Sequence, residues 1–152
     1  MTIPTLHPQL LGDWLGENLL WMNPAEPPLA SHSKMTVATT AQGKFITLAY
    51  TWAYEGKPQD GLLLIGDGNQ HGIASAGWVD SFHQSGKVMH CTGSASPTGF
   101  AVTGAYAAPP GPDWGWRLSV NASVTGELIL EMHNLPPGGE AELAVRAVYQ
   151  RA

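Results

Sequence analysis

Cysteine, charged residues and long apolar runs are all scarce in this sequence. The single cysteine, Cys91, cannot form an internal disulfide, so a reducing, cytoplasmic environment is the expected location. Charged residues make up 12% of the chain, about half the usual share of roughly 25%. Because the seven lysines and arginines are scattered singly, no basic patch is available to bind nucleic acid. No apolar run approaches about 18 residues, so no membrane-spanning helix is expected.

Motifs that carry well-known chemistry are also missing. There is no G-x-S-x-G nucleophile turn, no phosphate loop and no dinucleotide fingerprint, and residues 66–68 (GDG) lie between strands with no helix after them. The six histidines show no metal-binding spacing, so neither a metal nor another cofactor is expected. Residues 1–11 lack the basic start and continuous apolar centre of a signal peptide.

Glycine and proline, by contrast, are frequent, with 18 and 12 residues in a chain of 152. They gather in turn signals, such as residues 55–58 (EGKP) and 136–139 (PPGG), that recur every eight to thirteen residues. This spacing is typical of an all-β sandwich or barrel, and the length suits one domain over residues 1–152. The segments predicted as strands are 12–22, 32–41, 44–54, 60–67, 71–80, 86–95, 99–107, 113–121, 126–134 and 140–150.

Several of these segments alternate between apolar and polar residues. In 113–121 all the even-numbered residues are apolar, whereas Arg117, Ser119 and Asn121 share the other face, as expected of an antiparallel sheet with one wet side. Ten strands joined by short turns would leave two open edges unless the sheet closed on itself. We therefore predict a closed up-and-down barrel, with a Greek-key sandwich as the alternative. Residues 1–11, helical from about 4 to 11, would cap it.

The opening strand contains a recognisable pattern. Residues 11–17 (LGDWLGE) resemble the G-x-W-x-G opening of lipocalin-like (calycin) barrels. This opening and residues 78–81 (WVDS) are similar to motifs of the bacterial domain-of-unknown-function family fifteen seventy-nine. The order of the segments resembles that family over nearly the whole chain. Nitrobindin-type haem barrels share the architecture more distantly. Their tyrosine-proline stretch is replaced by residues 18–21 (NLLW), and the last strand has no histidine to bind haem. The resemblance implies the fold and assigns no catalytic residues.

Pairing each hairpin through its turn predicts which side chains face the interior. Bulky aromatic residues alternate there with small ones such as Ala74, Ala76 and Gly104, which would leave a wide barrel partly empty. A slip of one residue in any hairpin would invert the assignment from that point on. The predicted ligand contacts are Trp14, Tyr50, Trp52, Trp78, Asp80, His90, Thr92, Tyr106 and Trp116.

Each polar or unusual residue in this set also has a purely structural interpretation. Trp14 can be core rather than a ligand contact, and Asp80 can cap the following turn through backbone N–H groups. His90 can be a core histidine bonded to Asp80, a ligand contact or a proton-transfer group. His83 is expected in an exposed loop, and Glu131 and His133 on the outer face.

Three functional hypotheses follow from this interior. Apolar walls with a few convergent polar groups are typical of a small-molecule pocket, which favours a binder of a small, largely apolar molecule without catalytic activity. One alternative is an enzyme that uses His90 and Asp80 as an acid–base pair. The other is a filled, inert interaction module, in which exposed Trp21, Tyr54 or Trp114 would contribute to an apolar homodimer face.

Overall fold

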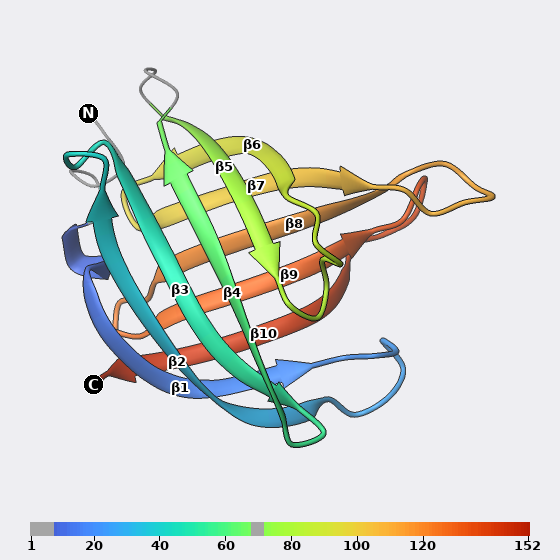
Figure 1. The fold of residues 1–152 in the computed structure, drawn as a ribbon, viewed down its shortest axis with the longest axis horizontal. Helices are drawn as coiled ribbons and strands as arrows, with labels where there is room; N and C mark the ends of the chain where they lie inside the picture. The colour runs from blue at the N-terminus through green and yellow to red at the C-terminus, as the bar shows by residue number, and fades with distance from the viewer. Residues whose placement is uncertain (1–7, 68–71) are drawn as a thin grey trace.

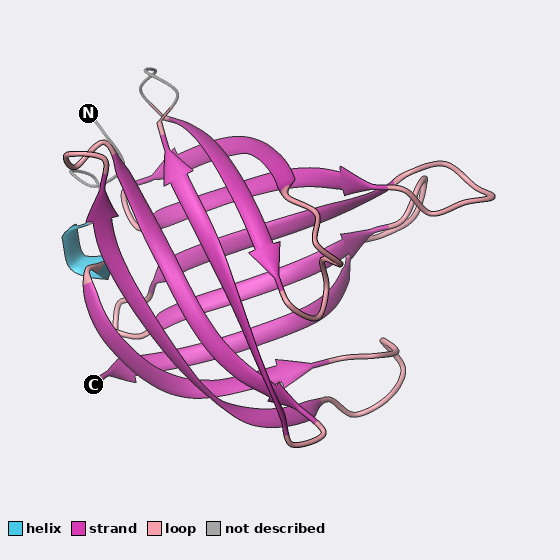
Figure 2. Ribbon diagram, in the orientation of Figure 1, coloured by secondary structure: helices cyan, strands magenta, loops and turns pink. Residues whose placement is uncertain are grey.

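The computed structural model describes residues 8–67 and 72–152. A single 3-10 turn, η1 (Pro8–Leu10), leads into ten strands that run up and down around a barrel (Figure 1). Figure 2 shows that strands and short loops make up almost all of the described chain. The strands are β1 (Gly12–Leu20), β2 (Leu29–Thr40), β3 (Phe45–Tyr54), β4 (Lys57–Gly66), β5 (Ile73–Asp80), β6 (Met89–Ser96), β7 (Gly99–Tyr106), β8 (Trp114–Ala122), β9 (Leu128–Leu135) and β10 (Glu142–Arg151).

The barrel closes where β1 pairs with β10. All the remaining pairs are antiparallel and join strands that follow each other in the chain. In the closing pair, called the seam below, Trp14 lies opposite Arg151 and Leu20 lies opposite Val145. A side-chain carbon at Gly16 would collide with the carbonyl oxygen of Val148, so glycine allows the two strands to come this close. The predicted closed antiparallel barrel is confirmed, and the Greek-key sandwich is not formed.

The interior follows the alternation of the strands. In β8, for example, Trp116, Leu118 and Val120 are buried, whereas Asn121 is exposed. The half of the interior around the starts of β1, β7 and β9 is packed mainly with aliphatic side chains, which exclude water from the barrel. These side chains include Val37, Ile46, Leu48, Leu63, Ile65, Val102, Leu118, Val120, Leu128 and Leu130.

One end of the barrel is sealed by Trp14. Its ring is 3% exposed, and its indole N–H donates to the Leu10 carbonyl oxygen over 2.9 Å. The Arg151 guanidinium lies 4.1 Å from the centre of the same ring and donates to the carbonyl oxygens of Leu11 and Gln9. The indole N–H of Trp14 and both terminal nitrogens of Arg151 therefore have partners, and Trp14 is part of the core.

The strand ends differ from the predicted ones by at most three residues. The largest consequence is at β6, which begins at Met89 rather than at residue 86, so that the preceding loop spans residues 81–88. Of the predicted N-terminal helix, the turn Pro8–Leu10 is described. Residues 1–7, and the predicted start of the fifth segment at residue 71, lie outside the described residues. No described helix is long and apolar enough to cross a bilayer.

Candidate functional site

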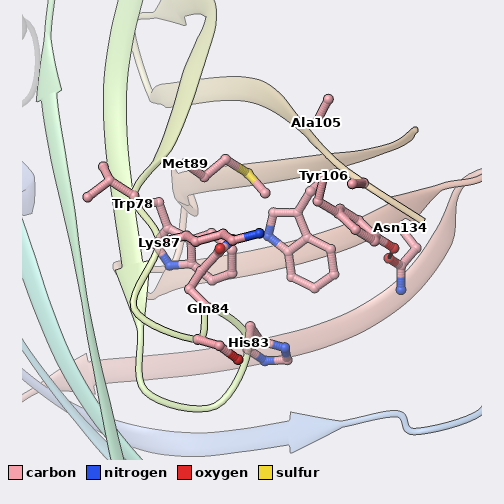
Figure 3. Close-up of a pocket in the computed structure, with 12 residues that line it drawn as sticks. Trp78, His83, Gln84, Lys87, Met89, Ala105, Tyr106 and Asn134 are labelled. Atoms are coloured by element: carbon pink, nitrogen blue, oxygen red, sulfur yellow. Dashed lines mark hydrogen bonds between the residues drawn. The ribbon is translucent and has the colours of Figure 1, made fainter. Parts of the chain in front are cut away.

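The candidate site lies at the opposite end of the barrel from Trp14. There the β5–β6 loop (81–88) and the last residues of β7 border a cavity of about 560 Å³. This volume is in the range of roughly 300–1,000 Å³ usual for small-molecule sites. Figure 3 shows the cavity with the side chains around it. The lining residues are Trp78, His83, Gln84, Ser85, Lys87, Val88, Met89, Ala105, Tyr106, Ala107, Trp116 and Asn134.

Two tryptophans from strands that are not neighbours form the inner wall of the cavity. The rings of Trp78 on β5 and Trp116 on β8 are stacked, with centroids 5.4 Å apart and an angle of 12° between their planes. The indole N–H of Trp78 donates to the Tyr50 hydroxyl oxygen over 2.9 Å. The indole nitrogen of Trp116 is buried and has no hydrogen-bond partner. The inner wall of the cavity therefore contains two stacked indoles, and the unpaired N–H of Trp116 is buried within that wall.

Asp80 holds the loop that borders the cavity. Its Oδ1 accepts the backbone N–H groups of Phe82 at 2.8 Å and His83 at 3.0 Å, and its Oδ2 accepts the Tyr50 hydroxyl at 2.7 Å. Burial, reinforced by the neighbouring carboxylate, raises the pKa of Tyr50 well above its usual value. The structural interpretation of Asp80 as a turn cap is therefore confirmed, and the carboxylate also connects the loop to β3.

The imidazole of His83 sits among aromatic rings rather than in solvent. It stacks on Trp52 with centroids 5.7 Å apart and planes at 21°, and it lies 5.3 Å from Trp116 and 5.9 Å from Trp78. Burial lowers the pKa of His83, and the charge of Asp80 only partly opposes this effect. The prediction of an exposed loop histidine is wrong, because the cap at Asp80 folds the loop back over the barrel opening.

Polar groups complete the outer part of the cavity. The Tyr106 hydroxyl donates to Asn134 Oδ1 over 2.6 Å, which leaves the amide N–H groups of Asn134 available for another acceptor. Burial, and then the charge of Glu142, raise the pKa of Tyr106. Lys87, from the β5–β6 loop, also lines the cavity (Figure 3).

The nine predicted ligand contacts fall into four groups. Trp78, Tyr106 and Trp116 line the cavity. Tyr50, Trp52 and Asp80 lie behind it and contact its wall or its loop. Trp14 is at the sealed end. His90 and Thr92 are exposed on the outer face of β6.

The inward assignment of His90 and Thr92 is wrong because both hairpins that contain β6 are shifted by one residue from the predicted pairing. Val102 pairs with Gly93 on one side and Trp78 pairs with Met89 on the other, so Met89 and Cys91 face inward instead. The two shifts cancel, which inverts β6 alone and leaves the predicted faces of β5 and β7 correct. His90 and Asp80 therefore lie on opposite faces of the barrel wall and cannot act as a pair.

Other reactive side chains are less well placed for chemistry. Cys91 is buried, and burial raises the pKa of its thiol to about 11, so it is a poor nucleophile. Glu131 and His133 lie on the outer face, as predicted, where Glu131 pairs with Arg146 at 2.5 Å. In residues 8–67 and 72–152, no group of three or more His, Cys, Asp or Glu side chains could hold a metal ion.

The fold and the cavity together define a closed ten-stranded antiparallel barrel of calycin-like form, with an aromatic pocket at one end. The chain belongs to the family described as protein of unknown function (DUF1579), whose model matches residues 6–151. No curated protein matches the chain.

Among solved structures, the chain is similar to the crystal structure of Rv2717c from M. tuberculosis. The two share 17% sequence identity with a TM-score of 0.67, over 98% of this chain and 96% of that one. At this level of identity the similarity supports the fold alone.

Proposed function

We propose that this protein binds a small, flat, largely apolar molecule in the cavity at the open end of the barrel. The observation that carries the proposal is the cavity of about 560 Å³ whose inner wall contains the stacked rings of Trp78 and Trp116. The indole N–H of Trp116 is buried within this wall without a partner, and leaving a buried donor unpaired costs about 1–3 kcal/mol. A ligand with a hydrogen-bond acceptor on an aromatic body would pair this donor once the side chains that cover the nitrogen move aside.

The arrangement of the surrounding residues supports binding rather than acid–base catalysis. The acid–base pair of His90 and Asp80 is separated by the barrel wall, and the Asp80 carboxylate is occupied by the Tyr50 hydroxyl and two backbone N–H groups. The cavity instead offers stacked rings and hydrogen-bond donors. These are the features by which small-molecule sites orient a ligand.

A suitable probe is 6-propionyl-2-dimethylaminonaphthalene, a neutral fluorescent dye with a flat ring system and one carbonyl acceptor. On titration with the protein its emission should shift to shorter wavelength and saturate, because the ring enters a dry site. In the variant Trp116→Phe, which keeps a ring but removes the N–H, the dissociation constant should rise about fivefold.

The matched control is Trp21→Phe, which removes an indole that does not line the cavity. It should bind the dye like the parent, and the thermal melts of both variants should show that they are folded. A parent protein that leaves the dye emission unchanged, or two variants that weaken binding equally, would rule out this site.

A further inference from the structure

The charge and donor pattern of the cavity narrows the class of ligand. We infer that the site selects a planar aromatic molecule carrying one oxyanion group, such as a carboxylate, and that Lys87 determines this selectivity. The inference rests on the proposed function, since it describes the ligand of the same cavity.

The first observation is the sign of the charge around the cavity. The chain carries a net charge of −5, with 12 acidic residues against seven basic ones. None of the described residues that line the cavity is acidic, and one of them, Lys87, is basic. An anion placed there would meet an ammonium group and no carboxylate on the cavity wall.

The second observation is that Lys87 has no acidic partner. Across residues 8–67 and 72–152 the one salt bridge joins Arg146 and Glu131 on the far outer face. Lys87 is one of the residues that line the cavity (Figure 3), so its unpaired ammonium group is available to a ligand there.

The third observation is that the other free groups are donors too. The phenol of Tyr106 donates to the amide oxygen of Asn134, which leaves the amide N–H groups of Asn134, and the indole N–H of Trp116 is unpaired but buried in the wall. An indole N–H, an amide N–H and an ammonium are all complementary to an oxygen that carries negative charge. Hydrogen bonds to a charged acceptor are about twice as strong as those between neutral groups.

Two acids near the cavity are bound elsewhere or lie outside its lining. Asp80 lies behind the wall, where its carboxylate accepts three hydrogen bonds from Tyr50, Phe82 and His83. Glu142 is opposite Asn134 on β10 and is not among the residues that line the cavity. Asp60 and Asp80 line a neighbouring pocket together with Lys87, but within residues 8–67 and 72–152 neither forms an ion pair with it. The ammonium group therefore remains unpaired where it lines the cavity.

The test uses two competitors of nearly equal size and shape, the anion 2-naphthoate and the neutral 2-naphthamide, each displacing the neutral naphthalene dye described above. Both have the same ring and a carbonyl acceptor. We expect the parent to bind naphthoate about tenfold more tightly than naphthamide. In Lys87→Met, which keeps the aliphatic stem, this ratio should fall to about threefold or less, with the affinity for naphthamide unchanged.

The control is Lys34→Met, which removes a lysine from the outer face of β2 and should keep the parent ratio. If the dye and both competitors fail to bind, the proposed function and this inference fall together. If the dye binds but the amide competes as well as the carboxylate, the proposed function stands and the inference is overturned. A preference for naphthoate that survives in Lys87→Met would also overturn it, because the selectivity would then arise elsewhere.

Discussion

Trp14 and Trp116 occupy opposite ends of the same barrel and are buried to nearly the same extent, with 3% and 5% of their surfaces exposed. At the sealed end, the indole N–H of Trp14 is bonded to the Leu10 carbonyl and its ring is covered by Arg151. At the open end, the N–H of Trp116 has no partner and its ring borders a cavity. Burial alone therefore does not distinguish a structural tryptophan from a candidate binding residue, whereas hydrogen-bond satisfaction does.

The largest loss of stability at the open end is expected from removing the Asp80 carboxylate, which binds the β5–β6 loop. In Asp80→Ala, two backbone N–H groups and the Tyr50 hydroxyl lose their acceptor inside the protein. We expect the free energy of unfolding to fall by about 3 kcal/mol, measured by urea denaturation. Asp60→Ala, which alters an exposed carboxylate on the adjacent strand β4, is the control and should change stability little. Equal effects in the two variants would contradict the role assigned to Asp80.

The two tryptophans can be compared directly by the same substitution. Trp14→Phe breaks a hydrogen bond and leaves the Leu10 carbonyl without that donor, whereas Trp116→Phe removes an N–H that has no partner. Both lose similar ring area, so Trp14→Phe should be the more destabilising by about 1–2 kcal/mol. Urea denaturation of both variants under one set of conditions measures the difference. Equal destabilisation would show that hydrogen-bond satisfaction does not separate the two ends.

A smaller change in the stability of the protein is expected when the pH is varied, because the pKa of His83 differs between the folded and unfolded states. Because burial holds the pKa of His83 below that of the unfolded chain, the unfolded state takes up the proton first as pH falls. Stability should therefore decrease as pH is lowered through about 6.5, and the decrease should level off below the folded-state pKa. His83→Phe keeps an aromatic ring but cannot titrate, so its melting temperature should depend less on pH over this range.

His133 provides the control for that experiment. Burial and the charge of Arg117 lower the pKa of His133, with Glu131 opposing them, so it contributes a dependence of the same sign from the outer face. The variant His133→Gln should therefore retain the part of the pH dependence that comes from His83. If His83→Phe and the parent melt with the same pH profile, the buried position of the imidazole is wrong.

Most of the fold was predictable because its signals are local. Period-two alternation and the turn residues between strands identified ten strands, and the closing of ten meandering strands into a barrel follows from the need to pair the two edge strands. The assignment failed at β6, where loop length was used to set which face points inward. The composition of that strand carried the better signal, because Met89, Cys91 and Ala95 are apolar while His90, Thr92 and Ser94 are polar.

The candidate site was only partly predictable. Trp78, Tyr106 and Trp116 were identified from strand alternation, whereas His83 and Lys87 come from a loop whose path depends on the hydrogen bonds of Asp80. Alternation has no meaning in such a loop. The tendency of Asp80 to cap a turn was a usable signal, since a capped turn directly after β5 would return the next residues over the barrel opening.

The seam between β1 and β10 also affects the order in which the molecule can assemble. Nine of the ten ladders join strands that are neighbours in the chain, but the contact from Arg151 to the Leu11 carbonyl spans 140 positions. Closing a loop of that length costs about 2 kcal/mol more in chain entropy than closing a hairpin of about ten residues. The hairpins should therefore form early and the seam late. The stacking of Arg151 on Trp14 can then form only after the other strands have paired, and it stabilises the closed barrel.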